Sequence, residues 1–414
     1  MNALPAEPTR QSSATLAFIA VIRGFLTVLL LAVVVGCGGG GGGDDGGQKQ
    51  SQPVLGASGD EEQPENPAPL GFPIFATKNT TRVAGADPIA DAAAVARAVY
   101  PSRTEESSPR AIVIVDQADW RSAISAAQLM APPLKAPILF SDSGELPAAS
   151  LEALEELAPS GADEIDGAQV IRIGEAAAKP ENRRSKDVPG ESSASLAQGI
   201  DKLQATAAGE PTANVLIAPA DSPEFAMPAA GWAARSGDPV LWTLKDTLPS
   251  ETKTAIEAHP RARIYVLGPE DAVSENVFRE LRKLGKTTRI AGPDPVTNAI
   301  AFARFSDGRF GWNVVDPGHG LVFANTSRTL DAASAAPLSG SGQYGPLLLL
   351  TDAAALPETL QDYLLDIQPG YDPDPVRGVY NHGWIVGDES AIAAAVQARI
   401  DTLLEIQPVD TGAE

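Results

Sequence analysis

The sequence predicts an α/β protein in which one parallel βαβ unit occurs three times. The first observation is a motif that appears twice, as TTRVAGADP at residues 80–88 and as TTRIAGPDP at residues 287–295. Each copy runs into an alanine-rich segment with helical spacing. The second observation is that short apolar runs and helical segments alternate in one order three times after residue 80. Such alternation is typical of parallel α/β folds, and recurrence at a fixed period indicates repeats.

The N-terminus is predicted to be a lipoprotein signal peptide over residues 1–36. Its apolar core, residues 25–36, suits a signal peptide better than a full membrane span. The order Val34-Val35-Gly36-Cys37 resembles the bacterial lipobox, in which the cysteine is lipidated and the leader is cleaved before it. The alternative is an uncleaved helix over residues 16–36, which would bury Arg23 at a cost. We therefore favour a cell-membrane protein that is anchored through lipidated Cys37 and faces outward to the cell wall.

A tether is expected to follow over residues 37–79. It opens with glycines and continues as an acidic, proline-rich stretch with little apolar surface to bury. Such a composition predicts disorder. A flexible segment of this length has a reach of roughly 30 Å, enough to hold a folded region away from the membrane.

The repeats are predicted at residues 80–190, at residues 191–286 with a degenerate opening, and at residues 287–405, before a tail at 406–414. Each repeat contains three strand-like runs, and the last run of each ends at a glycine. The runs are residues 110–115, 136–140 and 169–174 in the first repeat, 214–218, 238–242 and 263–268 in the second, and 320–324, 345–350 and 383–387 in the third. A Leu-Pro pair opens a helix after the second run each time. These signals recur about every hundred residues. Residues 176–193 are predicted to be a polar loop or partly disordered, and residues 195–200 are predicted to stand in for the first helix of the middle repeat.

Over residues 80–405 the chain resembles the cell wall binding repeat type 2 family of Gram-positive surface proteins. The shared pattern is Arg-x-Ala-Gly-x-Asp, an alanine-rich helix, an Asp-Ala helix, a Leu-Pro helix and a strand that ends in glycine. The resemblance implies three Rossmann-like parallel-sheet repeat units in a pseudo-threefold arrangement that bind an anionic wall polymer non-covalently. The chain departs from the pattern at Pro88 and Pro295, where the family has Arg-Tyr.

Five residues of these motifs are predicted to contact a polymer or a protein interface: Arg82, Asp87, Arg289, Asp294 and Asp331. For the two arginines, a structural alternative is favoured, namely a salt bridge or a carbonyl contact that fixes the strand. Gly85 and Gly292 are expected to serve tight turns.

The sequence contains only incomplete versions of enzyme signatures. The string G-x-G-x-x-G at residues 340–345 follows a predicted helix and precedes a strand, the reverse of a dinucleotide-binding turn. Ser250 and Lys253 spell S-x-x-K, but the partner motifs of that enzyme class are missing. We therefore expect no enzymatic activity.

The function predicted from the sequence is that of a lipid-anchored envelope protein attached non-covalently to a wall polymer. The alternative is an envelope scaffold or binding protein whose repeats contact a protein partner. The expected partners are thus the membrane, through Cys37, and a wall polymer or an envelope protein, with no nucleic acid.

Overall fold

The computed structural model describes residues 74–341 and 345–409 of the 414-residue chain. The predicted signal peptide, Cys37 and most of the predicted tether lie outside the described residues. None of the described helices combines the length and the apolar character needed to cross a membrane.

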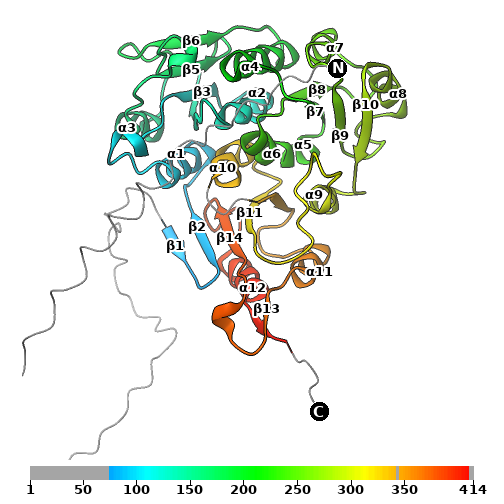
Figure 1. Cartoon of the computed structure of the whole chain (residues 1–414). Helices are drawn as coiled ribbons and strands as arrows, with labels where there is room; N and C mark the ends of the chain where they lie inside the picture. The colour runs from blue at the N-terminus through cyan, green and yellow to red at the C-terminus, as the bar shows by residue number, and fades with distance from the viewer. Residues whose placement is uncertain (1–73, 342–344, 410–414) are drawn as a thin grey trace, which may run out of the picture. The chain divides into compact units, whose positions relative to one another are not determined.

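Three parallel sheets, each with the same strand order, form the framework of the fold (Figure 1). The first has the order β4-β3-β5-β6 and consists of β3 (Ile112–Asp116), β4 (Ile138–Ser141), β5 (Val170–Ile173) and β6 (Ser185–Val188). The second has the order β8-β7-β9-β10 and consists of β7 (Asn214–Pro219), β8 (Val240–Thr243), β9 (Arg263–Leu267) and β10 (Lys286–Ile290). The third has the order β12-β11-β14-β2-β1 and consists of β11 (Gly320–Asn325), β12 (Leu347–Leu350), β14 (His382–Val386), β2 (Thr80–Val83) and the antiparallel edge strand β1 (Ile74–Ala76). The predicted α/β class with parallel sheets is confirmed, whereas the pseudo-threefold arrangement stays a prediction.

Helices connect and cover these strands (Figure 1). They are α1 (Pro88–Val99), α2 (Trp120–Ala126), α3 (Ala148–Leu157), α4 (Ser193–Ala208), α5 (Pro223–Ala226), α6 (Pro228–Ser236), α7 (Ser250–Glu257), α8 (Glu275–Leu284), α9 (Pro295–Arg304), α10 (Asp331–Gly340), α11 (Glu358–Asp366) and α12 (Ala394–Leu404). Short 3₁₀ turns are η1 (Glu105–Ser107), η2 (Ala127–Met130), η3 (Asp163–Ile165) and η4 (Pro375–Arg377). Within the predicted tail, β15 (Gln407–Pro408) pairs with β13 (Gly370–Tyr371).

The strand of each motif copy joins a sheet whose other parallel strands lie outside the predicted repeat that the motif opens. The strand of the second copy, β10, pairs with β9, so that Arg289 lies opposite Val266. The strand of the first copy, β2, pairs with β14 near the other end of the chain, so that Arg82 lies opposite Ile385. The last sheet is therefore built from both ends of the described region.

The prediction of a polar loop over residues 176–193 is wrong for Ser185–Val188. This segment forms β6, which pairs in parallel with β5. Its side chains are mostly polar because it is an edge strand, with only Val188 buried. Gly190 and the N-cap Ser192 of α4 follow it, just as Gly85 and the N-cap Asp87 follow β2. The middle repeat lacks the Arg-x-Ala-Gly sequence motif, but its backbone follows the same order of strand, glycine and capped helix.

The glycines of the motif are needed for close approach to a helix rather than for a turn. Neither Gly85 nor Gly292 has a left-handed φ. A Cβ atom on Gly85 would lie 2.6 Å from the carbonyl carbon of Ala90, and one on Gly292 would lie 2.4 Å from the backbone nitrogen of Asn298. The expected role in a tight turn is therefore replaced by packing of the preceding strand against the first turn of the helix.

Small residues allow the central helices to approach closely. Helix α10 packs against α6 and α1, and α6 packs against η2. A Cβ atom on Gly231 would lie 2.8 Å from Ser339 Oγ, and one on Gly340 would lie 2.9 Å from the Ala234 oxygen. One hydrophobic cluster extends across all three sheets.

Candidate functional site

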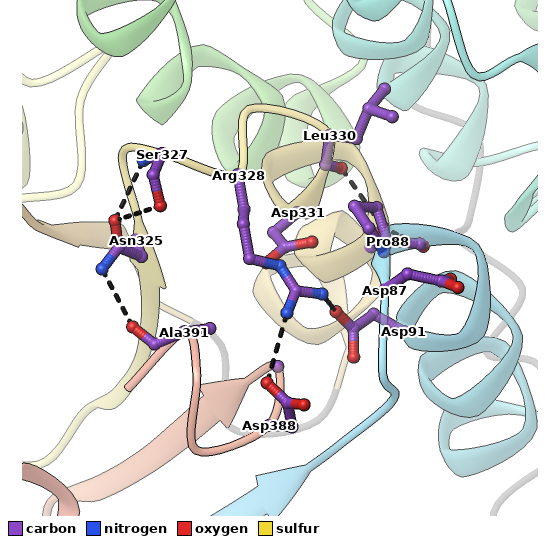
Figure 2. Close-up of polar contacts among 12 residues, drawn as sticks. Asp87, Pro88, Asp91, Asn325, Ser327, Arg328, Leu330, Asp331, Asp388 and Ala391 are labelled. Carbon is purple, nitrogen blue, oxygen red and sulfur yellow. Dashed lines mark hydrogen bonds and ion pairs between the residues drawn. The ribbon is translucent and has the colours of Figure 1, made fainter. Parts of the chain in front are cut away.

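The candidate site lies at the carboxyl end of the third sheet. Strand β11 lies between β12 and β14 in the sheet. The chain leaves β11 towards β12 on one side, and after β12 it crosses to β14 on the other side of β11. In open α/β sheets, the crevice at such a point binds ligands. Figure 2 shows the loops that meet there, which follow β2, β11 and β14.

Arg328 occupies the centre of this site and faces carboxyl groups from three elements (Figure 2). Its Nη2 donates to Asp91 Oδ2, from α1. Its Nε lies 2.9 Å from Asp331 Oδ2, at the start of α10, and its Nη1 lies 3.5 Å from Asp388 Oδ1, in the loop after β14. The guanidinium thus joins the beginning of the described chain to its last third.

Two of these carboxyl groups are fully buried, with side chains 0% exposed. Burial raises the pKa of Asp91 to about 8, helped by the charge of Asp331 and opposed by Arg328. Burial also raises the pKa of Asp331 to about 6, against the effect of Arg328. The pKa of Asp388 is lowered, first by its hydrogen bond from Ser390. Burial therefore favours the protonated forms of both Asp91 and Asp331, whereas the hydrogen bond from Ser390 favours the ionised form of Asp388.

Further hydrogen bonds hold the surrounding loops. The Asp91 Oδ1 atom accepts from Gly85 N at 2.6 Å, which fixes the turn after β2. The Asn325 Oδ1 atom accepts from Ser327 N, and its Nδ2 donates to the Ala391 oxygen at 2.9 Å (Figure 2). Asn325 therefore ties the loop after β11 to the loop after β14.

The charged cluster is complete in only one of three corresponding places. Each sheet has one position that corresponds to Asp91 and one that corresponds to Asp331. The first is found by counting four residues from the N-cap of the helix, and the second by matching the registers of the paired strands. In the other two sheets these positions hold Leu196 with Ser122 and Asn298 with Phe225. Ser122 Oγ and Asn298 Nδ2 are buried without a hydrogen-bond partner among the described residues. The three places therefore differ chemically although their backbones correspond.

Arg82 is buried, and its contacts are those of the structural alternative. Its Nη1 donates to the Gly387 and Asp388 oxygens at 2.8 and 2.9 Å, and its Nη2 donates to the Ile392 oxygen at 2.6 Å. Its Nε donates to Gln397 Oε1 at 2.8 Å. These bonds shape the same loop that presents Asp388 to Arg328.

Arg289, the counterpart of Arg82 in the second sheet, is half-buried and less well bonded. Its Nη1 donates to the Gly268 oxygen at 3.0 Å, its guanidinium lies 4.8 Å from the Phe278 ring centroid, and its Nη2 has no described partner. Asp87 and Asp294 are exposed N-caps of α1 and α9. Whether any of these residues contacts a polymer stays a prediction.

The structure brings Asp331 together with three residues that sequence reasoning missed. These are Asp91, Arg328 and Asp388. Asp91 left one signal, an acidic residue within an alanine-rich run on a predicted helix, where a charge would be buried. Arg328 left another, since it stands three residues before Asp331. Cys37 lies outside the described residues.

The chemistry of the cluster favours a structural role over catalysis. A carboxyl pair with separated, raised pKa values is a pattern of acid–base sites. Here, however, both Asp91 and Asp331 are shielded from solvent. Across residues 74–341 and 345–409, no group of three acidic, His or Cys side chains is placed to hold a metal ion.

Comparisons with known proteins agree with this architecture. Residues 289–397 match the family described as Cell wall binding domain 2 (CWB2), which confirms the family resemblance for the last repeat and marks the chain as a cell-wall-associated protein of the envelope. No curated protein gives a significant sequence match.

Two solved structures share the fold. Cwp6 from Clostridium difficile superposes with a TM-score of 0.63 at 18% identity, over 79% of this chain and 48% of that one. Cwp8 from Clostridium difficile gives 0.61 at 17% identity, over 79% of this chain and 52% of that one. The chain therefore corresponds to about half the length of each.

Proposed function

We propose that this chain is a non-enzymatic, lipid-anchored protein that attaches non-covalently to a polymer of the cell wall. The observation that carries the proposal is the match of residues 289–397 to a cell wall binding domain. That segment supplies Arg328, Asp331 and Asp388, and it ends at Gln397, the partner of Arg82. The matched segment therefore contains three of the four charged residues of the candidate site, and the fourth, Asp91, comes from α1.

The geometry supports a polymer contact at the exposed edge of the candidate site. Asp388 keeps 40% of its side chain exposed, and Asp87 is also exposed near the beginning of α1. Carboxylates accept hydrogen bonds, so this edge suits the hydroxyl groups of a sugar polymer. Arg328 acts as a positioning residue, because only 14% of its side chain is exposed and its Nη1 lies 3.5 Å from Asp388 Oδ1.

Retention on purified cell walls tests the proposal. The full chain in detergent is mixed with intact walls and with walls stripped of their secondary polymers. We expect retention on the intact walls only. Arg328→Gln should lose most of it, whereas Arg304→Gln, which removes an exposed ion pair with Asp366, should not. Equal recovery from both kinds of wall, or from neither, would rule out polymer binding.

The anchor is tested separately. Cys37→Ser should abolish incorporation of a labelled fatty acid and release the chain from the membrane fraction. A Cys37→Ser chain that remains in the membrane fraction without label would favour the uncleaved helix.

A further inference from the structure

A hollow beside α4 shares no residue with the candidate site and is called here the α4 hollow. It has a volume of about 530 Å³, which lies in the range of small-molecule sites in proteins. Alanine, proline and glycine form much of its wall, and the polar side chains among them include Gln128, Asp201, Gln204 and Glu210. An apolar wall that carries a few convergent polar groups is typical of a ligand pocket.

Three of these polar side chains are buried and fixed in position. Gln128, Asp201 and Gln204 are each no more than 5% exposed. Gln128 Nε2 donates to the Gly237 oxygen at 2.9 Å and to Asp201 Oδ1 at 3.2 Å. These bonds join η2 to α4 and to the residue that follows α6, so the wall of the hollow is held from three elements.

Gln204 carries an acceptor that no described residue satisfies. Its Nε2 donates to the oxygen of Pro132 at 2.8 Å, and Pro132 also lines the hollow. Turning the amide over would set two oxygens against each other, so this bond identifies the other atom as Oε1. Oε1 is buried and has no hydrogen-bond partner among the described residues. Because a buried acceptor without a partner is costly, it indicates a place where a bound donor fits.

The charges at the hollow favour a cation. Asp201 and Glu210 are the ionisable side chains that line it, whereas Lys202 lines a neighbouring hollow. Behind Asp201, His259 Nδ1 donates to the Thr212 oxygen at 2.7 Å, and a single proton lies between His259 Nε2 and Asp201 Oδ2, which are 2.8 Å apart. The Asp201–His259 pair is therefore neutral as a whole. Glu210 is exposed and forms no ion pair within the described chain, so its carboxylate is free to accept.

The corresponding places at the other two sheets lack these polar groups. Asp201 and Gln204 stand nine and twelve residues after the N-cap Ser192 of α4. The same counts from the N-caps of α1 and α9 give Ala96 with Val99 and Ala303 with Ser306. Both alanines are buried, so the repeated fold accepts an apolar residue where α4 has Asp201.

Linking η2 to α4 explains Gln128 and Asp201 but leaves Gln204 Oε1 and Glu210 without a role. We propose that the α4 hollow binds a compact molecule that carries a primary ammonium group. An ammonium group has three donors and no acceptor, which suits the free acceptors at Gln204 and Glu210. A metal ion fits less well, because no group of three acidic, His or Cys side chains in the described chain is placed to hold one. Amino sugars and lysine side chains both present this group, and the inference does not depend on binding of a wall polymer.

The test titrates the full chain in detergent with glucosamine and with Nα-acetyllysine amide, after isotope labelling of its histidine rings. His259 reports on the site by NMR, because it contacts Asp201 and the chain has only 3 histidines. We expect its signals to shift with a dissociation constant on the order of 1 mM, while those of His319 and His382 stay unchanged. N-acetylglucosamine and the Nε-acetylated lysine compound lack the charge and should bind at least about tenfold more weakly.

Matched variants locate the site. Glu210→Gln should weaken binding of both amines about tenfold, whereas Glu257→Gln, which makes the same charge change at an exposed position of α7 outside the hollow, should stay within about twofold. Gln204→Met keeps the side-chain length, removes the acceptor and should also weaken binding about tenfold. Ala208→Trp keeps the test valid if Gln204→Met fails to fold, because Ala208 is exposed and lines the hollow, so a large side chain there should block it.

Each outcome decides for or against the inference. A preference for one of the two amines supports it and identifies the carrier as a sugar or a lysine side chain. Amines that leave the His259 signals unchanged, or acetylated compounds that bind as well as the free amines, would overturn it. Equal losses in Glu210→Gln and Glu257→Gln would reduce the effect to the acidity of the whole chain. Unchanged binding by Ala208→Trp would place the amine elsewhere.

Discussion

Arg82 donates from Nε to Oε1 of Gln397, at 2.8 Å, although the two residues are 315 positions apart. One belongs to the second strand of the described region and the other to its last helix. Together with the carbonyl contacts of Arg82, this bond holds the two ends of the chain in one sheet.

Replacing Arg82 should therefore destabilise the whole described unit. Arg82→Leu removes four hydrogen bonds and leaves buried acceptors without a partner, which should cost about 3 kcal/mol or more. Urea denaturation followed by circular dichroism measures this. Arg289→Leu, which removes one carbonyl contact, should cost about 1 kcal/mol. Similar losses in both variants would contradict the special role of Arg82.

The pKa of Asp91 predicts a pH dependence of stability. Its pKa rises from 3.8 to about 8 on folding, so the folded state binds the extra proton. The resulting stabilisation is fully present below pH 3.8 and is lost as the pH rises through 8. Asp91→Asn carries no titrating group, so stability should fall less steeply between pH 4 and pH 8. Denaturation series at several pH values measure the two slopes, and parallel curves would contradict the assignment.

Asp388 should behave in the opposite way. Its pKa is lowered by the hydrogen bond from Ser390 and by Arg328. The stabilisation that ionised Asp388 gives to the folded state is present above the pKa of this residue in the unfolded chain. It is lost as the pH falls through the lower pKa of the folded state. In Asp388→Asn, the loss of stability in acid should be smaller than in the unchanged chain. The same denaturation series, extended below pH 4, provides the measurement.

A buried histidine should titrate above its usual range. His259 Nε2 lies 2.8 Å from Asp201 Oδ2, and its Nδ1 lies 2.7 Å from the Thr212 oxygen. Burial lowers the pKa of His259, but the hydrogen bond and charge of Asp201 outweigh it and the net shift is upward. Its stabilisation is therefore present below pH 6.5 and lost at higher pH. NMR titration should show an ordinary or lowered pKa for His259 in Asp201→Asn, and an unchanged value would refute the pairing.

The glycines of the motif should not tolerate a side chain. Gly292→Ala places a Cβ atom 2.4 Å from the Asn298 nitrogen, so the strand and the helix must separate, at about 1–3 kcal/mol. Gly209→Asn is the control, because nothing lies within 4 Å of its Cβ position and asparagine tolerates a left-handed φ. Thermal unfolding compares the two, and an unaffected Gly292→Ala would contradict the close-approach explanation.

Local sequence patterns predict most of the strands and helices. They do not predict which strands and side chains pair across long distances in the sequence. Runs such as Ile112–Asp116 are apolar and buried on both faces, which makes them visible in the sequence. Strand β6 was missed because Lys186 and Asp187 face solvent at a sheet edge. The site was missed because Arg328 and Asp91 lie 237 positions apart, and no local periodicity reports such a contact. Asp331 was found through its motif, although its buried setting was not foreseen.

The pairing of β2 with β14 also sets an order of events during synthesis. Arg82 and Gly387 are 305 positions apart, so the first leaves the ribosome roughly 15–60 s before the second at ordinary elongation rates. Throughout that interval β2 has only the short edge strand β1 beside it, and the Arg82 guanidinium has none of its carbonyl partners in the loop after β14. The last sheet can close only after nearly the whole described chain is available, and this high contact order predicts a slow final step of folding.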